Sequence, residues 1–281
     1  MKAKKVLFIT QEIKPYVPES EMSNIGRFLP QGIQEKGKEI RTFMPKWGNV
    51  NERRNQLHEV IRLSGMNLII DDTDHPLIIK VASIQSARMQ VYFIDNDDYF
   101  QQRLMKTDEN GVEYADNDER AIFYARGVLE TVKKLRWCPD VIHCQGWMSA
   151  LVPLYIKMAY NEEPSFRDSK VGFSLFGEGF ENKLSEGFAD KIMLKGIDKN
   201  QIEEIIKPDS GFEDLCKLAI SYSDGIIQNS EKVNPEMLDY AQSKGIPVLE
   251  YQSEDTYISA FNNFYDKIWS LGKEETEENE D

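Results

Sequence analysis

The chain has 281 residues, 41% hydrophobic and 11% aromatic, which is typical of a folded protein with a substantial core rather than of a disordered chain. Its net charge of −14 argues against a nucleic-acid partner, because phosphate binding needs clustered Lys and Arg. No apolar run is long enough to span a bilayer and none resembles a signal peptide, so we expect a cytoplasmic protein without a membrane partner.

The first part of the chain predicts a βαβ unit and then a meander. Residues 5–10 are almost wholly apolar, as in a central parallel strand that is covered on both faces. Residues 24–36 have apolar side chains at helical spacing, Gly37 marks the helix stop, and residues 40–44 form the next strand. Asp, Asn and Pro separate three closely spaced apolar runs, which predicts an antiparallel meander; the runs are 68–70, 77–81 and 91–94.

From residue 118 onward, helix and strand patterns alternate. The predicted helices are 118–135, 147–158, 212–222, 235–244 and 256–271, and the predicted strands are 141–144, 171–175, 225–228 and 247–249. This alternation predicts an α/β fold with a doubly wound, Rossmann-like and mostly parallel sheet. Ligands bind beyond the carboxyl ends of such strands, so we expect a site in the loops that follow them: 10–22, 45–47, 95–98, 143–147 and 176–181.

The last predicted helix, about 256–271, places large apolar side chains along one face. Burying each of them stabilises the fold by about 1.5–3 kcal/mol, so we expect this helix to dock on the sheet and close a single domain over residues 1–271. A dimerisation helix is the alternative. Residues 272–281 carry six acids and one base, which predicts a disordered acidic tail.

The sequence contains no motif for a metal or a cofactor. None of the three Cys forms a Cys-x-x-Cys pair, which argues against a zinc site. No Gly-x-Gly-x-x-Gly follows a strand, and the nucleophile motif Gly-x-Ser-x-Gly is absent. We therefore expect neither a metal nor a cofactor.

Several phrases resemble bacterial glycogen synthases and plant starch synthases. The best match is residues 139–155, which contain Asp140-Val-Ile-His-Cys-Gln-Gly-Trp147. The resemblance runs in register from about residue 5 to residue 247; its other phrases are 5–16, 29–33, 43–47, 92–95, 117–130 and 222–230.

This resemblance implies the N-terminal half of a GT-B glucosyltransferase. Members of the family have two Rossmann-like halves and transfer glucose from ADP- or UDP-glucose to an α-1,4-glucan with retention of configuration. Their N-terminal half serves the acceptor and part of the catalytic centre, and their C-terminal half holds most of the nucleotide sugar. The length of this chain leaves room for the first half only. Helix 256–271 then matches the family's final helix, which crosses back onto the N-terminal domain.

The resemblance also assigns family-equivalent catalytic positions. Asp116 matches an acidic residue of the active-site loop, and His143 matches the first His of the family's His-x-His-Asp-Trp motif. Gln145 and Gly146 replace the second His, which contributes to the catalytic centre, and the Asp. A hydrogen-bonded structural role is favoured for His143 over catalysis, because its usual neighbours are replaced. Asp116 also fits a solvated acid or a helix cap.

The loop after the first strand departs from the family as well. Family members have Lys-Thr-Gly-Gly-Leu there, and the glycines let the backbone approach the donor phosphates. Residues 17–22 contain no glycine or Lys, and Glu19 and Glu21 would repel a pyrophosphate. The family's Thr-Ile-His-Asn phrase is replaced by Ser174-Leu-Phe-Gly177.

Three residues are candidates for substrate binding: Trp147, Glu178 and Tyr16. Trp147 is suited to stacking on a sugar ring, although packing at a strand–helix junction is an equal alternative. Glu178 and Glu181 follow one strand, and paired acids serve glycoside chemistry, but the sequence does not set their separation.

We therefore expect a glycogen- or starch-synthase-like protein that is catalytically incomplete alone. It would bind an α-1,4-glucan or oligosaccharide, or pair with a full-length synthase or a donor-binding subunit. One alternative is an active glucosyltransferase that works as an oligomer or with a separate donor-binding subunit. Each lost catalytic donor is worth on the order of several kcal/mol in barrier height, which disfavours that reading. A protein-interaction scaffold unrelated to carbohydrate is the other alternative.

Overall fold

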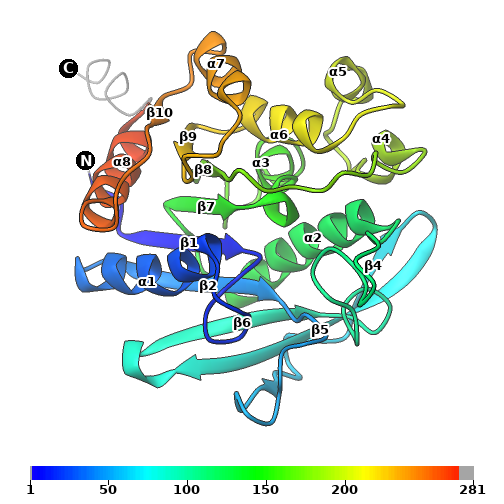
Figure 1. Ribbon diagram of the computed structural model, residues 1–281, viewed down its shortest axis with the longest axis horizontal. Coiled ribbons are helices and arrows are strands. Elements are labelled where there is room, and N and C mark those ends of the chain that lie inside the picture. Colours follow the sequence, from blue (N-terminus) through cyan, green and yellow to red (C-terminus); the bar gives the residue numbers. More distant parts are fainter. Residues whose placement is uncertain (1, 272–281) are drawn as a thin grey trace.

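The computed structural model describes residues 2–271, and within them ten strands form one twisted sheet (Figure 1). The strand order is β10-β9-β8-β7-β1-β2-β6-β5-β3, and β4 pairs with β5. The strands are β1 (Lys5–Thr10), β2 (Glu39–Pro45), β3 (His58–Glu59), β4 (Met66–Ile70), β5 (Thr73–Ile84), β6 (Met89–Asp95), β7 (Val141–Gln145), β8 (Lys170–Leu175), β9 (Gly225–Gln228) and β10 (Val248–Leu249).

Pairing in the sheet confirms the predicted α/β class with a mostly parallel sheet. All pairs from β10 to β6 are parallel. β5 is antiparallel to β6, β4 and β3. The meander therefore extends the parallel sheet through β6, and it does not form a separate domain.

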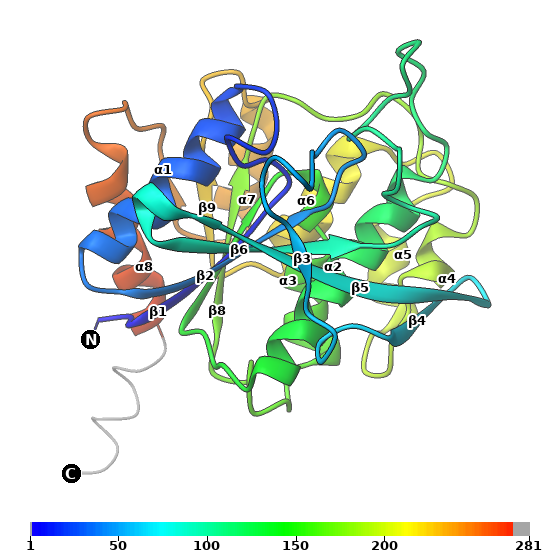
Figure 2. The ribbon, with the colours of Figure 1, turned by 90° about the horizontal axis from the view of Figure 1, so that it is seen from below.

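Helices cover both faces of the sheet. Helices α1 and α8 lie on one face, and α2, α3 and α6 lie on the other (Figure 2). The α-helices are α1 (Glu21–Glu35), α2 (Asn117–Leu135), α3 (Val152–Leu154), α4 (Phe188–Lys191), α5 (Lys199–Ile205), α6 (Phe212–Ser221), α7 (Pro235–Ser243) and α8 (Tyr257–Ser270). Shorter turns are η1 (Gln85–Ala87), η2 (Trp147–Ser149) and η3 (Tyr155–Ala159).

Four helical segments differ from the sequence-based expectation. Helix α1 begins three residues early, because Ser20 and Ser23 form a capping box. The predicted helix 147–158 is broken into η2, α3 and the π-helical η3. Pro153 lies in this segment and has no N–H to donate to the carbonyl four residues earlier. Helices α4 and α5, between β8 and α6, were not predicted.

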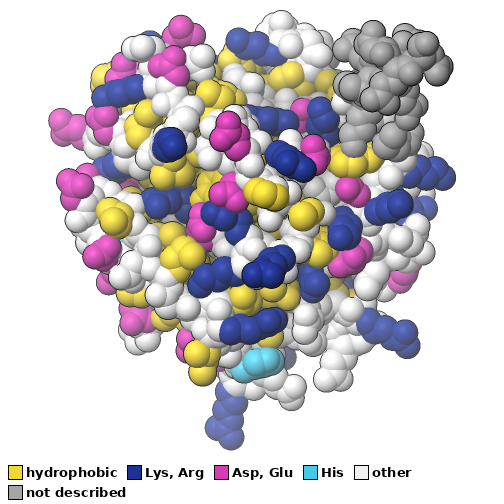
Figure 3. All heavy atoms as spheres, turned by 180° about the vertical axis from the view of Figure 1, so that it is seen from behind, with side chains coloured by type: hydrophobic (Ala, Val, Ile, Leu, Met, Phe, Trp, Pro, Cys, Tyr) yellow, Lys and Arg dark blue, Asp and Glu magenta, His cyan; other side chains and the backbone are white. Residues whose placement is uncertain are grey.

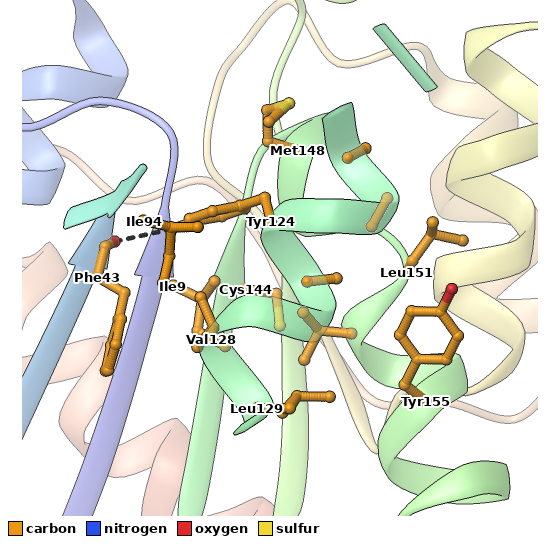
Figure 4. Packing of buried hydrophobic residues seen from close by; sticks show 14 of the residues in the cluster. Ile9, Phe43, Ile94, Tyr124, Val128, Leu129, Cys144, Met148, Leu151 and Tyr155 are labelled. Atoms are coloured by element: carbon orange, nitrogen blue, oxygen red, sulfur yellow. Dashed lines mark hydrogen bonds between the residues drawn. The ribbon is translucent and has the colours of Figure 1, made fainter. Parts of the chain in front are cut away.

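The main hydrophobic cluster lies under α2 and reaches the carboxyl ends of β1 and β2 (Figure 4). The buried hydroxyl of Tyr124 is 2.7 Å from the Thr10 carbonyl oxygen and 2.9 Å from that of Phe43. Because one proton is shared between two carbonyls of adjacent strands, α2 is held at the edge of the sheet where the loops of the site begin.

Helix α8 packs against the opposite face. Its buried side chains join Val6 and Phe8 of β1 and Leu29 of α1 in a second cluster; they are Tyr257, Phe261, Phe264, Tyr265 and Ile268. Lys38 donates to Asp266 over 2.7 Å and ties the helix to the segment before β2. The expected acidic tail, residues 272–281, lies outside the described residues.

The molecular surface is mixed in character. On the face shown in Figure 3, hydrophobic side chains lie singly or in small groups between Lys, Arg, Asp and Glu, as is normal for a folded domain. Among residues 2–271, no helix has the length and apolar character needed to cross a membrane.

Candidate functional site

Loops at the carboxyl ends of β1, β7, β8 and β9 converge on one pocket, named here the edge pocket. Its volume is about 80 Å³, well below the ~300 Å³ at which ligand pockets begin, so it can hold only part of a ligand. It is lined by Gln11, Glu12, Ser20, Glu21, Met22, Met105, Lys106, Trp147, Phe176, Gly177, Glu178, Gly179, Ser230 and Lys232. An adjoining pocket of about 280 Å³ shares Lys106, Phe176, Gly177, Gly179 and Lys232 with it.

Two of the candidate residues lie in the edge pocket. Trp147 is 3% exposed and packs edge-to-face on Phe180, with 5.4 Å between ring centroids. Glu178 is exposed at the pocket wall. Glu181, its expected acidic partner, lines the adjoining pocket, and its backbone N–H donates to the Glu113 carboxylate over 2.9 Å.

Two other candidates lie elsewhere. Tyr16 lines a different pocket, on the other side of the loop after β1. Asp116 occupies the N-cap position of α2, but its carboxylate makes no capping bond. It pairs instead with Arg103 through contacts of 2.9 and 2.5 Å. Burial raises the pKa of Asp116, but the hydrogen bonds and charge of Arg103 outweigh burial and leave this pKa below its ordinary value.

His143 is fully buried in the middle of β7. Its Nε2 lies 2.6 Å from Ser174 Oγ, while the Tyr265 hydroxyl and the Gln145 amide face Nδ1 at 2.8 and 3.3 Å. Asn229 also donates to Ser174 Oγ. We assign the proton to Nε2, because Nδ1 faces two donors. Burial lowers the pKa of His143 to about 3, so the ring is neutral at physiological pH.

Gln145 and Gly146 are built into the core of the domain. The Gln145 side chain is fully buried, and its Oε1 has no hydrogen-bond partner among the described residues. Gly146 has φ +81°, and a Cβ there would lie 2.4 Å from Gln11 Oε1. That oxygen accepts a hydrogen bond from Met148 N over 3.2 Å. Gln11 therefore fills the space that a side chain at position 146 would need.

The charges lining the edge pocket are mainly negative. Glu12, Glu21 and Glu178 line it together with Lys106 and Lys232. Burial raises the pKa of Glu12, a hydrogen bond from Ser20 opposes this shift, and the charge of Glu178 adds to it. A pyrophosphate would meet more negative than positive charge here.

Three further lining residues were not predicted from the sequence: Glu12, Lys106 and Lys232. Glu12 and Lys232 each lie just after a strand end, which is the signal that identified the other site loops. Lys106 had no such signal, because the loop 97–116 has no periodic pattern. Tertiary contacts place Lys106: its carbonyl accepts from Asn117 Nδ2 over 2.9 Å, and its ammonium donates to the Gly179 carbonyl over 3.0 Å.

The buried Arg120 holds the loop that carries Lys106. Its guanidinium donates to the carbonyls of Tyr99, Leu104 and Met105 over 2.8–2.9 Å. Within the described part of the chain, no three His, Cys, Asp or Glu side chains are grouped so as to hold a metal ion.

Known proteins share this architecture. A family model described as the starch synthase catalytic domain matches residues 5–249. A glycogen synthase of Pelodictyon phaeoclathratiforme is 38% identical over 268 residues, which cover 95% of this chain and 54% of that protein. A glycogen synthase of Chlorobium limicola is 39% identical over 168 residues, or 59% of this chain and 34% of that protein.

Among solved structures, the catalytic domain of starch synthase IV from Arabidopsis thaliana, bound to ADP and acarbose, matches with a TM-score of 0.68 and 18% identity. The match covers 92% of this chain and 53% of that chain, and it shows the shared fold. The chain spans about half the length of the curated relatives it matches.

Proposed function

The chain belongs to the starch synthase catalytic-domain family, and from this premise we propose that it binds an α-1,4-glucan or oligosaccharide at the edge pocket without itself transferring glucose. The burial of Gln145, together with the filling of the space beside Gly146 by Gln11, carries this proposal. The rearranged motif is part of the packed core and is not presented to a ligand.

Chemistry at the replaced positions supports the absence of transfer. A Gln amide does not titrate near neutral pH, so Gln145 cannot take the place of a tuned His as a general acid or base. The three acids of the edge pocket disfavour a donor pyrophosphate. Each missing transition-state contact is worth on the order of several kcal/mol, and several such losses exclude efficient turnover.

Saccharide binding is supported by the composition of the pocket wall. The small exposed parts of Trp147 and Phe176 (3% and 8%) line the wall, and Glu178, Ser230 and Lys232 supply polar groups beside them. Apolar ring surface with a few convergent hydrogen-bonding groups is the general pattern of small-ligand sites.

The edge pocket is too small to enclose a ligand by itself, so we propose that a second protein completes the site. A full-length synthase or a separate donor-binding subunit would supply the opposite wall of the site and enclose the glucan between two chains. An active oligomer is the competing function, and calorimetry with ADP-glucose and UDP-glucose distinguishes it, because micromolar affinity for either nucleotide sugar would favour it.

Two assays test the proposed function. Incubation of the purified chain with ADP-glucose or UDP-glucose and glycogen should give no glucosyl transfer, and robust turnover would refute the proposal. Maltoheptaose should raise the Tm, because a ligand that binds only the folded state stabilises it. The substitution Glu178→Gln should reduce this shift. The exposed Glu162 lines neither pocket, so Glu162→Gln should leave the shift unchanged.

A further inference from the structure

A separate pocket of about 370 Å³ lies on the other side of the loop after β1. We name it the arginine pocket. It is formed by that loop, by the turn at residues 51–56 and by the end of β5. Its polar lining residues are Tyr16, Arg54, Asn55, Gln56, Ser83 and Gln85.

The charge of this pocket is opposite to that of the chain. The protein has 48 Asp and Glu against 34 Lys and Arg, yet the pocket is lined by Arg54 and by no acid. Arg27 of α1 is close enough for its charge to act on Tyr16, and it donates to Ser86 Oγ over 3.3 Å. Within residues 2–271 neither arginine forms an ion pair; Arg27 Nη1 donates to Gln31 Oε1 over 2.6 Å, and Arg54 is exposed.

Tyr16 lines this pocket as well. The residue is 6% exposed, and its ring packs edge-to-face on Phe93 with 4.9 Å between centroids. Its hydroxyl makes no hydrogen bond with any other described residue. Burial raises the pKa of Tyr16 to about 12, so the hydroxyl keeps its proton. The hydroxyl is not sealed from solvent, so a ligand oxygen in the pocket can replace water as its acceptor.

The turn that presents Arg54 is internally held. Asn51 Oδ1 accepts from the Arg54 backbone N–H over 2.8 Å, and Asn55 Nδ2 donates to the Asn51 carbonyl over 2.8 Å. Gln56 has φ +54°, a left-handed conformation that is uncommon for a residue other than Gly. Such strain persists where the surroundings enforce it, and it concentrates at ligand sites.

We propose that the arginine pocket binds a phosphate monoester, with the Arg54 guanidinium pairing with phosphate oxygens and the Tyr16 hydroxyl donating to the same group. A guanidinium fork matches phosphate geometry, and the amides of Asn55, Gln56 and Gln85 are further donors. The volume suffices for a hexose phosphate as well as for free phosphate. This site is separate from the edge pocket and is independent of the proposed glucan binding.

Calorimetric titration at constant ionic strength tests the site with inorganic phosphate, glucose 1-phosphate, glucose 6-phosphate and the neutral maltotriose. Maltotriose is titrated into the Glu178→Gln variant, so that binding at the edge pocket is reduced. The proposal is supported if the phosphate compounds bind more tightly than maltotriose does in that variant. Tighter binding of a hexose phosphate than of phosphate identifies a sugar phosphate as the ligand, and equal binding identifies free phosphate. No binding of any phosphate compound would overturn the proposal.

Neighbouring arginines provide a matched control. Arg54→Gln should weaken phosphate binding tenfold or more. Arg53→Gln removes the same charge from an exposed residue that does not line the pocket, and it should preserve binding. If both variants lost the same amount of phosphate affinity, the effect would come from the change in overall charge. That result would contradict the proposed site. Tyr16→Phe keeps the ring that packs on Phe93 and should weaken binding severalfold; unchanged affinity in this variant would count against the assigned hydroxyl contact.

Discussion

The hydroxyl of Tyr265 in α8 lies 2.8 Å from Nδ1 of His143, in the middle of β7. This contact joins two residues 122 positions apart. The rings of Phe8, Phe261 and Tyr265 surround the imidazole. His143 therefore belongs to the interface between the sheet and α8, and a ligand in the edge pocket cannot exchange a proton with it while α8 is docked.

Burial of neutral His143 predicts a pH dependence of stability. Its pKa falls from 6.5 to about 3 on folding, so between these values the unfolded chain binds more protons. The stabilisation is fully present above pH 6.5 and is lost as pH falls toward 3, at up to about 1.4 kcal/mol per pH unit. The free energy of unfolding is measured by urea denaturation at pH 6 and at pH 5. Between these two values it should fall by about 1.4 kcal/mol more in wild type than in His143→Gln. The exposed-residue variant His58→Gln should follow wild type. Parallel curves for wild type and His143→Gln would contradict this prediction.

Helix α8 should be required for the stability of the domain. Phe261 is 1% exposed in the cluster between α8 and the sheet, and Phe261→Ala should cost about 3–5 kcal/mol in the free energy of unfolding. The exposed Asn263 lies on the same helix, so Asn263→Ala should cost far less. Truncation after Glu250 removes the whole helix and should cause aggregation or a marked drop in Tm. A truncated chain that stays monomeric and melts like wild type would show that α8 does not stabilise this domain.

Restoring the family's Asp at position 146 should destabilise the protein and create no transfer. Gly146 is in the left-handed region, and its Cβ would meet Gln11 Oε1 at 2.4 Å, so Gly146→Asp should lower the Tm. The double variant Gln11→Ala/Gly146→Asp removes the colliding amide and should recover part of the loss. Differential scanning fluorimetry measures both effects. If Gly146→Asp alone melted like wild type, Gln11 would not be the obstacle.

Arg120 should hold the loop that carries Lys106. Its fork reaches three backbone carbonyls, and Lys lacks the geometry to bind all three. Arg120→Lys should therefore cost several kcal/mol, because buried carbonyls left unpaired cost about 1–3 kcal/mol each. Amide exchange should accelerate in residues 99–106, while the exposed control Arg136→Lys should leave it unchanged. Unaltered exchange in Arg120→Lys would assign the rigidity of this loop to other contacts.

Local patterns predicted every strand except the two-residue β3, and they predicted most of the helices. The apolar run at 5–10 matches β1 residue for residue, and the pattern at 225–228 matches β9. The prediction of one helix over 147–158 was wrong. The spacing of apolar residues carries no information about the missing N–H of Pro153. The capping box at Ser20 and Ser23 was readable, since both side chains are local to the helix start.

The sequence by itself determined the α/β class, the family motif with its replacements at Gln145 and Gly146, and the apolar face of α8, because each depends on residues that are near in the chain. Tertiary structure alone decided that Gln11 fills the space beside Gly146 and that Tyr16 faces away from the edge pocket. It also decided that Lys106 and Lys232 line one pocket. The physical reason is that these relationships join loops from different strands, and their distances follow from strand order and side-chain packing, which no local pattern encodes.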